Sequence, residues 1–564
     1  MLVVAPKESS VLLLPTTAIT NPTARSSDYG GDSRTDTIHH QGKVKEGPLV
    51  QTNQGPIRGL QAEDGDYSMF MGIPFGKIQE DNPFGTALPY PKFEQVFKAY
   101  NDSAICPQRE EFNSTITGSL DCLHLHIYAP NKASPINKVP VLAWIYGGGF
   151  NVGFAGRFVY GPKFLVSHDI ILVSINYRLG PYGFMCLDTP EVPGNQGLKD
   201  QLLALRWIKD NIAAFGGDVD KITIMGESAG SVSVELHLMS EQEKLFNQII
   251  MQSTSALSPL AEPFSDKKAP LKIAHKLGYK TEDLSDALKF LAKTDPKLVI
   301  AASIDLSLVF VTCVEKAFDG VESIIPVHPL LADVPKAKNT KVLAGFNNKE
   351  QLVQAALRPV DAFKNLNAFR ILAMGFNVDE DFQEMEDTVR RFYIGDEEMT
   401  ESLRWNLMEF ESDWLFNFPI QWSVANYLEK GAQEVYQYMF SYSGGRNFFK
   451  NRNNVTEEGA SHADELGYLF DLSFYSTQSA EDQRMIDQIT TLWANFVKYG
   501  DPTPETSELL PVKWLPVTKD VYSYMDIGSE LAIKRRAYHK RLGFMQLFYK
   551  ANWNKLKGNN IFHK

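Results

Sequence analysis

Apolar residues in the second quarter of the chain follow two alternating patterns. Nearly unbroken apolar runs occupy residues 139–146 (VPVLAWIY) and 169–177 (DIILVSINY), which is typical of parallel strands that are buried on both faces. In residues 195–216, by contrast, leucines and isoleucines recur at every third or fourth position, and this spacing predicts an amphipathic helix. The glycine pair Gly216 and Gly217 predicts where that helix ends.

The alternation of strands and helices continues toward the C-terminus. Residues 221–225 (KITIM) and 246–253 (FNQIIMQS) have the composition of short strands, and residues 229–239 between them are helix-like. Two further strands are predicted at 340–347 and 434–442, and a long helix is predicted around 485–497. This order predicts an α/β fold, in which helices cover both faces of a largely parallel sheet.

The domain organisation is predicted to be simple. Residues 1–46 are rich in Ser, Thr, Gly and charge without sustained periodicity, which favours a disordered leader. Order is expected to begin near residues 48–60, as two short strands around a turn at Asn53–Gly55. There are no internal repeats, so we expect residues 47–555 to form one domain with helical insertions, followed by a tail at 556–564.

The composition excludes some classes of partner. Of the 564 residues 44% are hydrophobic and 22% charged, with a formal net charge of -12, which is ordinary for a globular protein. Nucleic acid is not expected as a partner, because phosphate binding needs a concentrated positive surface. No apolar stretch approaches the length of a membrane span. The two apolar clusters within residues 1–18 are split by Lys, Glu and Ser and make a poor signal peptide.

The cysteines and sequons bear on the cellular compartment. Cys106 and Cys122 flank a polar loop, and their spacing is compatible either with a disulfide or with two unpaired thiols; Cys186 and Cys313 have no obvious mates and are expected to be free. No Cys/His cluster has metal-ligand spacing, and no metal or cofactor is predicted. Three Asn-x-Ser/Thr sequons, which would suit a secreted or luminal chain, are candidate glycosylation sites at Asn101, Asn113 and Asn454. A cytoplasmic location stays open, because no clear signal peptide is present.

Ser228 lies in the sequence Gly-Glu-Ser-Ala-Gly, between a predicted strand and a predicted helix. In that context the pentapeptide favours a nucleophile raised on a sharp turn, with Gly226 and Gly230 making room for the bend. The alternative is an ordinary serine at a helix N-terminus. A serine nucleophile also needs a base and fixed donors for the oxyanion that forms on attack.

A glycine-rich loop after the strand at 139–146 meets the second of these needs. In "YGGGF", Gly147, Gly148 and Gly149 follow the strand directly. One explanation is a tight turn, but three glycines in a row exceed what a turn requires. We therefore expect the N–H groups of Gly148 and Gly149, with that of Ala229, to form an oxyanion hole.

Taken together, these motifs resemble the type-B carboxylesterase family of α/β-hydrolases, which includes the cholinesterases, and most nearly its insect carboxylesterases. The resemblance covers nearly the whole predicted domain. It rests on the segments FMGIPFG, CPQ, DCLHLHIYAP, YGGGF, INYRLGPYGF, PGNQGLKDQLLALRWIKDNIAAFGGD, GESAGS, NNKE and SHADELGYLF.

The resemblance implies residue roles that the pattern alone does not single out. The family's acid position falls on Glu350, and its catalytic histidine falls on His462. The chain order Ser228, Glu350, His462 agrees with that of this fold. The resemblance also implies an α/β-hydrolase fold and a disulfide between Cys106 and Cys122.

Several departures from the family concern the substrate. The loop before Cys122 contains no Trp, so a choline ester would lose its cation–π partner. Juvenile hormone esterases usually have Gln before the nucleophile, whereas this chain has Glu227. Leu260 stands where many relatives carry an acyl-pocket Trp, and we expect it to admit bulkier acyl groups. The family's second disulfide, around Ser258, has no cysteine to form it.

The sequence therefore predicts a serine hydrolase that cleaves small carboxylic esters, in detoxification or in clearance of odorant or pheromone esters. Three alternatives are retained: an inactive, esterase-like adhesion module, an esterase that sequesters organophosphates stoichiometrically, and a juvenile-hormone-type esterase. The intact motifs disfavour the first. The sequence does not specify an oligomeric state.

Overall fold

The computed structural model describes residues 45–475 and 479–558. The expected leader at 1–46 therefore lies almost entirely outside the described residues, as does most of the expected tail at 556–564. The first strand begins at Glu46. At the other end, the described part of the tail packs onto the domain, with Leu556 bridged to Phe376 and 2% exposed.

The centre of the molecule is a 13-stranded sheet with the strand order β1-β2-β3-β9-β11-β10-β12-β13-β14-β15-β16-β17, and β6 pairs with β2 off this path. The run from β11 to β16 is parallel. Along the main path the strands outside this run pair antiparallel, whereas β6 pairs with β2 in parallel. The strands are β1 Glu46–Thr52, β2 Gly55–Gln61, β3 Tyr67–Pro74, β4 Gly76–Lys77, β5 Leu88–Pro89, β6 Phe97–Lys98, β7 Gln108–Arg109, β8 Ile116–Thr117, β9 His124–Pro130, β10 Val139–Ile145, β11 Ile171–Ile175, β12 Gly217–Glu227, β13 Gln248–Gln252, β14 Lys341–Asn347, β15 Glu434–Phe440, β16 Ser523–Ile527 and β17 Leu531–Arg535.

The predicted strands match this sheet. The continuous apolar runs form β10 and β11, whose residues are nearly all fully buried, as parallel strands covered on both faces require. The expected turn at Asn53–Gly55 joins β1 and β2, with Thr52 paired to Gly55. The expected α/β fold, a large and mostly parallel sheet with helices, is confirmed.

The helices are α1 Lys163–Val166, α2 Gly180–Phe184, α3 Gln196–Asn211, α4 Ala229–Met239, α5 Ala269–Lys276, α6 Leu284–Ala292, α7 Pro296–Asp305, α8 Leu352–Leu357, α9 Phe382–Ile394, α10 Arg404–Ser412, α11 Phe418–Glu429, α12 Phe448–Arg452, α13 Leu466–Leu469, α14 Ala480–Tyr499 and α15 His539–Ala551. The helix predicted from residues 195–216 is α3, which continues as a short 3-10 turn to Phe215 before Gly216 ends it in a left-handed conformation. The helix predicted around 485–497 is α14. No helix among the described residues is long and apolar enough to cross a bilayer.

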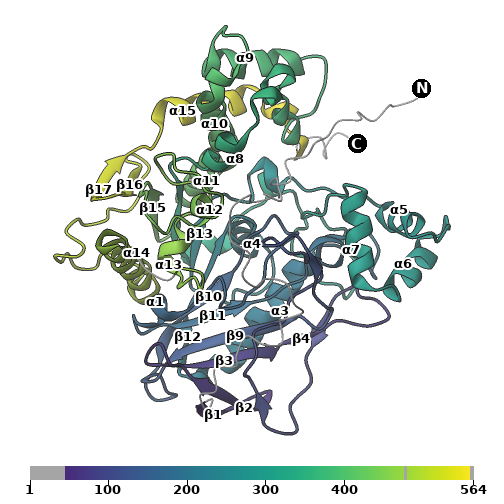
Figure 1. Ribbon diagram of the computed structural model, residues 1–564, viewed down its shortest axis with the longest axis vertical. Coiled ribbons are helices and arrows are strands. Elements are labelled where there is room, and N and C mark those ends of the chain that lie inside the picture. The colour runs from purple at the N-terminus through teal and green to yellow at the C-terminus, as the bar shows by residue number, and fades with distance from the viewer. Residues whose placement is uncertain (1–44, 476–478, 559–564) are drawn as a thin grey trace, which may run out of the picture.

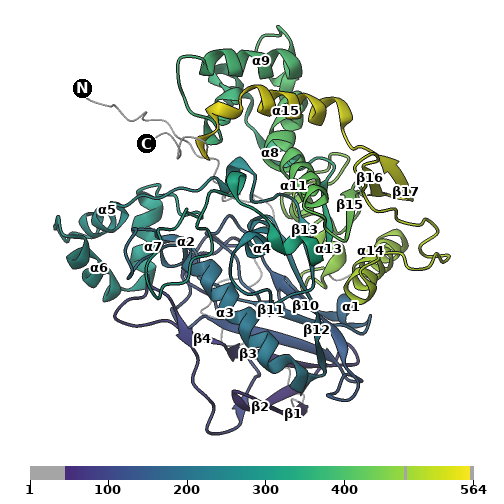
Figure 2. The same cartoon turned by 180° about the vertical axis from the view of Figure 1, so that it is seen from behind.

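The helical insertions gather at the periphery of the sheet. Helices α5, α6 and α7 lie together on one side, and α14 lies on the other with β16 and β17 (Figure 1). Helices α8, α9, α10 and α15 form a separate helical group at the end of the long axis opposite to β1 and β2, and both views show this arrangement (Figures 1 and 2). Within this group, α9, α10 and α15 share a hydrophobic cluster that includes Trp414 and Phe376, whereas the buried residues of α8 belong to a smaller cluster.

All four cysteines form disulfides. Cys106 bonds to Cys122, as the family resemblance implied. The expectation that Cys186 and Cys313 are free is wrong, because they bond to each other. These two cysteines are 127 residues apart in the sequence, so only the fold brings them together and no local spacing could have indicated the pair.

Candidate active site

Ser228 lies at the sharp turn between β12 and α4. Its backbone has φ 57° and ψ -125°, a conformation that non-glycine residues rarely adopt and that costs about 1–3 kcal/mol. The turn is held from both sides, because the Ser228 N–H donates to the Gln252 carbonyl at 2.9 Å and the Ser228 carbonyl accepts from the Val232 N–H at 3.0 Å. Ser228 itself is partly exposed. The surrounding strands and helix therefore fix the strained backbone of Ser228 at the carboxyl end of the central strand β12.

The glycines on either side of Ser228 are required by close packing. A Cβ on Gly226 would lie 2.3 Å from the Gly230 carbonyl carbon, and a Cβ on Gly230 would lie 2.0 Å from the Ile145 carbonyl oxygen. No side chain fits at either distance. Space for the bend is thus the physical reason for the glycines of this motif, as their spacing predicted.

The glycine-rich loop after β10 lies directly against Ser228. A Cβ on Gly147 would meet the Ser228 Cβ at 2.8 Å. Gly148 and Gly149 have φ values of 109° and 59°, which glycine adopts without strain. Within the described residues, the N–H groups of Gly148 and Gly149 donate no hydrogen bond. Ala229 is the first residue of α4, so its N–H also lacks an intrahelical partner.

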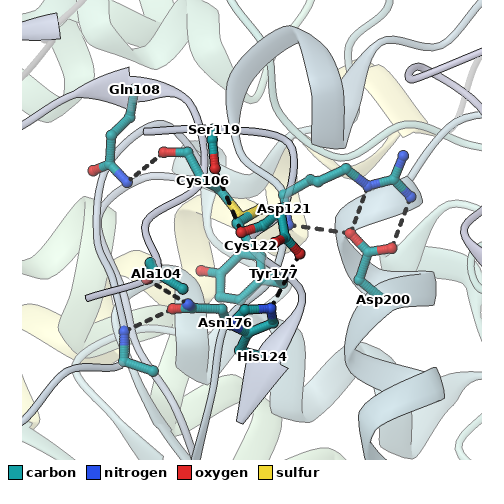
Figure 3. The surroundings of a disulfide bond; sticks show 12 residues. Ala104, Cys106, Gln108, Ser119, Asp121, Cys122, His124, Asn176, Tyr177 and Asp200 are labelled. Atoms are coloured by element: carbon teal, nitrogen blue, oxygen red, sulfur yellow. Dashed lines mark hydrogen bonds and ion pairs between the residues drawn. A yellow bond between two sulfur atoms is a disulfide. The ribbon is translucent and has the colours of Figure 1, made fainter. Parts of the chain in front are cut away.

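The loop that the Cys106–Cys122 disulfide closes, residues 106–122, packs against the segment after the glycine loop. The Gln108 side chain donates to the Cys106 and Gly153 carbonyls at 3.1 and 2.8 Å, and it accepts from the Gly153 N–H at 2.8 Å. Figure 3 shows Gln108 beside the Cys106–Cys122 disulfide. The disulfide is therefore connected through one buried amide to the segment that follows the three glycines.

Glu350 and His462 meet although they are 112 residues apart in the chain. Glu350 follows β14 and is fully buried, and its Oε2 lies 2.8 Å from the His462 Nδ1. Its other oxygen accepts from the Asn347 N–H at 2.7 Å, and its backbone carbonyl accepts from the His462 N–H at 2.9 Å. The acid and the imidazole are thus held together through both side chain and backbone.

The second ring nitrogen of His462 faces Glu227, the residue before Ser228. The His462 Nε2 and the Glu227 Oε1 are 3.1 Å apart, with both side chains nearly buried. Within the described residues, the Ser228 hydroxyl makes no hydrogen bond. His462 is therefore flanked by two carboxylates, and its Nε2 points to the immediate neighbour of the candidate nucleophile.

These contacts shift the pKa values at the site. Burial opposes the charged form of His462, but the nearby carboxylates of Glu227 and Glu350 outweigh burial and raise the pKa of His462 to about 9. Burial raises the pKa of the Glu227 carboxyl to about 8, although His462 opposes that shift. Glu227 and His462 thus form a buried pair whose proton sits close to the candidate nucleophile.

Sequence reasoning missed a third buried carboxylate, Glu465. Its oxygens accept from the side-chain amides of Gln252 and Asn347 at 2.9 and 2.6 Å. Burial, reinforced by Glu350, raises the pKa of Glu465. A signal was available, because Glu465 lies three residues after His462 in the segment SHADELGYLF. The contact between Glu227 and His462 was also missed, since it depends on the folded positions of both residues.

The remaining candidates are the acyl-pocket candidate Leu260 and the three sequon residues. Leu260 is partly buried at the edge of the hydrophobic cluster of the helical group. The sequon residues Asn101, Asn113 and Asn454 are all exposed, as an acceptor for a glycan must be, and their glycosylation stays a prediction. The predicted oxyanion donors, serine and acid, in contrast, follow the carboxyl ends of the central strands β10, β12 and β14, and the predicted histidine contacts Glu350 and Glu227.

This arrangement suits acyl transfer. Ser228, on its strained turn, lies beside the backbone N–H groups of the glycine loop, which have no hydrogen-bond partner within the described residues. The His462 imidazole, oriented by the buried Glu350 carboxylate, lies next to Glu227, the residue before Ser228. These are the parts that attack on a carbonyl requires, namely a nucleophile, a base and donors for the oxyanion.

Comparisons with a family profile, with curated proteins and with solved structures all find carboxylic-ester hydrolases. The sequence profile described as "Carboxylesterase family" matches residues 46–545. Bile salt-activated lipase of Rattus norvegicus is 31% identical over 88% of this chain and 84% of its own length. Esterase FE4 of Myzus persicae is 30% identical over 87% of this chain and 91% of its own. The solved structure of juvenile hormone esterase from Manduca sexta, with OTFP covalently attached, is 26% identical, covers 90% of this chain and 99% of its own, and has a TM-score of 0.78.

Proposed function

The chain belongs to the carboxylesterase family and is a carboxylic-ester hydrolase, and from this premise we propose that Ser228 is its nucleophile, His462 its general base and acid, and Glu350 the acid that orients the imidazole. One observation carries the proposal: Glu350 holds the Nδ1 of His462 at 2.8 Å, and the Nε2 faces the residue that precedes Ser228. The strained turn at Ser228 supports the same assignment.

The first step needs a small movement of His462. Its Nε2 contacts Glu227 at 3.1 Å, so the neutral imidazole turns from Glu227 to the Ser228 hydroxyl and takes its proton as the oxygen attacks the ester carbonyl. Glu350 accepts a hydrogen bond from the Nδ1–H throughout and stabilises the imidazolium. Glu227 offers the imidazolium a second carboxylate, which supports the protonated state.

The oxyanion formed in this attack is stabilised by backbone donors. We assign this role to the N–H groups of Gly148, Gly149 and Ala229, which have no hydrogen-bond partner within the described residues. Loss of one such donor typically costs about 2.7–4 kcal/mol of transition-state stabilisation. Because these donors belong to the backbone and are fixed by the fold, no reorganisation is needed when charge develops.

The tetrahedral intermediate collapses to the acyl-enzyme as His462 gives its proton to the departing alcohol. The acyl-enzyme is then hydrolysed by the same route, with a water molecule in the place of the alcohol. His462 removes a proton from this water as it attacks the acyl carbonyl, and returns the proton to the Ser228 oxygen as the carboxylic acid leaves. The Manduca sexta relative carries OTFP covalently attached, which is consistent with covalent chemistry in this family.

The substrates are proposed to be esters with an apolar acyl or alcohol part. The disulfide-closed loop contains no Trp to hold a quaternary ammonium, and Leu260 leaves more room than Trp would. Detoxification of dietary or xenobiotic esters and clearance of odorant or pheromone esters both fit this class. Two relatives are named juvenile hormone esterase, so juvenile hormone belongs in the substrate panel, although Glu227 departs from the Gln that is usual in such enzymes.

The proposal is tested by replacing Ser228 with Ala and assaying p-nitrophenyl and naphthyl esters graded by acyl length. We expect Ser228→Ala to lose nearly all activity while its circular dichroism and melting temperature stay close to wild type. Ser240→Ala, at the end of the same helix, is the matched control and is expected to stay active. Retained activity in Ser228→Ala would show that the nucleophile is misassigned.

Pre-steady-state kinetics separate turnover from sequestration. With 1-naphthyl acetate we expect steady release of 1-naphthol well beyond one equivalent per enzyme. A burst of one equivalent followed by negligible release would favour the sequestering esterase, and no release at all would favour the inactive module.

A further inference from the structure

The helical run from Arg404 to Glu429 is interrupted by a π-helical segment, η8, at Asp413–Asn417. We propose that η8 is a positioning element of the active site, which fixes His462 and the loop after β13, and which is itself held in place by Arg541 of α15. This inference rests on the function proposed above, because it concerns the geometry of the assigned base.

A π-helical segment is rare and persists where its altered register is useful. Here η8 lies between α10, which belongs to the helical group, and α11, which packs on β14 and β15 of the sheet. The extra residue of a π turn shifts the side chains that follow it around the helix. Within this segment the Leu415 carbonyl contacts the loop after β13, and the ring of the next residue, Phe416, packs on His462.

The first contact of η8 is with the imidazole. The rings of Phe416 and His462 have centroids 4.8 Å apart and are tilted by 53°. Phe416 is 3% exposed, so it has little freedom to move away. Glu350 and Glu227 contact the two nitrogens of the His462 ring. Phe416 packs on the same ring through an apolar contact and so limits its rotation.

The second contact of η8 is with the loop that runs from Ser253 to Ala261. A helical carbonyl normally accepts from the N–H four residues later, but for Leu415 that residue is Pro419, which has no N–H. The Leu415 carbonyl accepts instead from the Thr254 and Ser258 hydroxyls at 3.0 and 2.7 Å. This loop carries Leu260, the proposed acyl-pocket residue.

A third contact joins the start of η8 to the acid. The Ser412 hydroxyl, one residue before η8, accepts from the Gln351 N–H at 3.1 Å. Gln351 directly follows Glu350. The segment thus touches the loops of the acid, the base and the acyl side.

The position of η8 depends on a buried ion pair. Asp413 is fully buried and accepts from the Tyr393 hydroxyl at 2.8 Å and from the Asn417 amide at 2.9 Å. Its charge is balanced by Arg541, whose Nε lies 2.9 Å from the Asp413 Oδ2. Arg541 also contacts Glu409 at 2.5 Å on the more exposed side.

Arg541 connects α15 to the acid by a second route. Its guanidinium lies over the Tyr538 ring at 4.1 Å. The Tyr538 hydroxyl donates to the Asn348 carbonyl at 2.6 Å, two residues before Glu350. Helix α15, which runs along the outer helical group (Figure 2), is therefore joined to the active-site loops through Asp413 and through Asn348.

The test compares two ways of removing the ion pair. Arg541→Met removes the guanidinium alone. The double variant Asp413→Asn/Arg541→Met removes both charges but keeps an amide for Tyr393 and Asn417, so it leaves no buried unpaired charge. Glu409→Gln is the matched control, because it removes only the exposed partner of the same arginine. Arg541→Lys tests rescue by a conservative change.

The rates of all variants are expressed per active site. The concentration of active sites is given by the fraction of enzyme that a fluorophosphonate labels at Ser228. We expect kcat of Arg541→Met and of the double variant to fall on the order of tenfold, since small displacements of catalytic groups are costly, with partial recovery in Arg541→Lys. KM should change far less. The butanoate-to-acetate rate ratio should also shift severalfold, because the loop with Leu260 is released.

Two results would overturn the inference. One is a normalised kcat within twofold of wild type in the double variant, even if its melting temperature drops, since the ion pair would then serve stability alone. The other is an equal loss in Glu409→Gln. Failure of the proposed function gives a different result, because the wild type itself would then not be labelled at Ser228.

Discussion

The two halves of the proposed active site are built in different ways. The elbow side consists of the glycine loop 147–149 and the turn 226–230. It is shaped by backbone packing, with a hypothetical Cβ on Gly230 only 2.0 Å from a neighbouring carbonyl oxygen. The acid–base side consists of residues 347–350 and 461–465. It is shaped by side-chain hydrogen bonds among buried polar groups, such as the pair between Glu350 and His462.

This difference affects how each half tolerates change. Backbone packing offers no alternative arrangement, so a single methyl group is enough to disrupt the elbow side. Hydrogen-bonded side chains can be replaced by isosteres, so the acid–base side can lose function while the fold remains. Gln252 connects the halves, since its carbonyl accepts from the Ser228 N–H and its amide donates to Glu465.

The largest effect is expected on the elbow side, from Gly230→Ala. The added Cβ cannot fit, and overpacking of this severity costs about 3 kcal/mol or more. We expect little folded enzyme and almost no activity, measured by thermal unfolding and by hydrolysis of p-nitrophenyl acetate. Gly543→Ala in α15 is the control, because nothing lies within 4 Å of its added Cβ, and it should gain about 0.5–1 kcal/mol. A folded, active Gly230→Ala enzyme would refute the packing argument.

Glu350→Gln is expected to give the next largest effect, on the acid–base side. The amide keeps the shape of the side chain but no longer fixes the tautomer or stabilises the imidazolium of His462, so kcat should fall on the order of 10³- to 10⁴-fold. The melting temperature should change much less than in Gly230→Ala. A loss below tenfold would mean that Glu350 does not orient the imidazole.

The same contrast explains how much could be predicted from the sequence. The motifs of the elbow side are each local, because the strand, the turn and the helix around Ser228 are contiguous and the glycine loop directly follows its own strand, and the pattern predicted both motifs. The acid–base side joins residues 112 positions apart, so Glu350 and His462 could be named only through family resemblance. Contacts that depend on tertiary packing were not predictable, as with the bond between Cys186 and Cys313 or the packing of Phe416 on His462.

Glu227→Gln tests the contact between Glu227 of the elbow side and His462 of the acid–base side. The Glu227 carboxylate contributes to the raised pKa of His462 of about 9, so its removal lowers that pKa. Because the base must be neutral, the acidic limb of the kcat/KM profile should move to lower pH by roughly one to two units. A profile measured on 1-naphthyl acetate checks this shift. An unchanged limb, or one displaced to higher pH, would contradict the assigned contact.

The smallest effect is expected from Leu260→Trp, at the proposed acyl-pocket position outside both halves. The larger ring should fill space for long acyl chains, so the ratio of hexanoate to acetate hydrolysis should fall several-fold, or about 1 kcal/mol in discrimination. Leu260→Met, which conserves volume, should leave the ratio close to wild type. An unchanged ratio in Leu260→Trp would remove Leu260 from the acyl pocket.

The most direct test of the central claim is to trap the acyl-enzyme and find the atom that carries it. Wild-type enzyme and His462→Ala are mixed briefly with a p-nitrophenyl ester, quenched in acid, digested and analysed by mass spectrometry. We predict that the acyl group is on Ser228 in the wild type and that no acyl peptide accumulates in His462→Ala. An acyl group on another residue, or equal acylation of Ser228 without His462, would contradict the account.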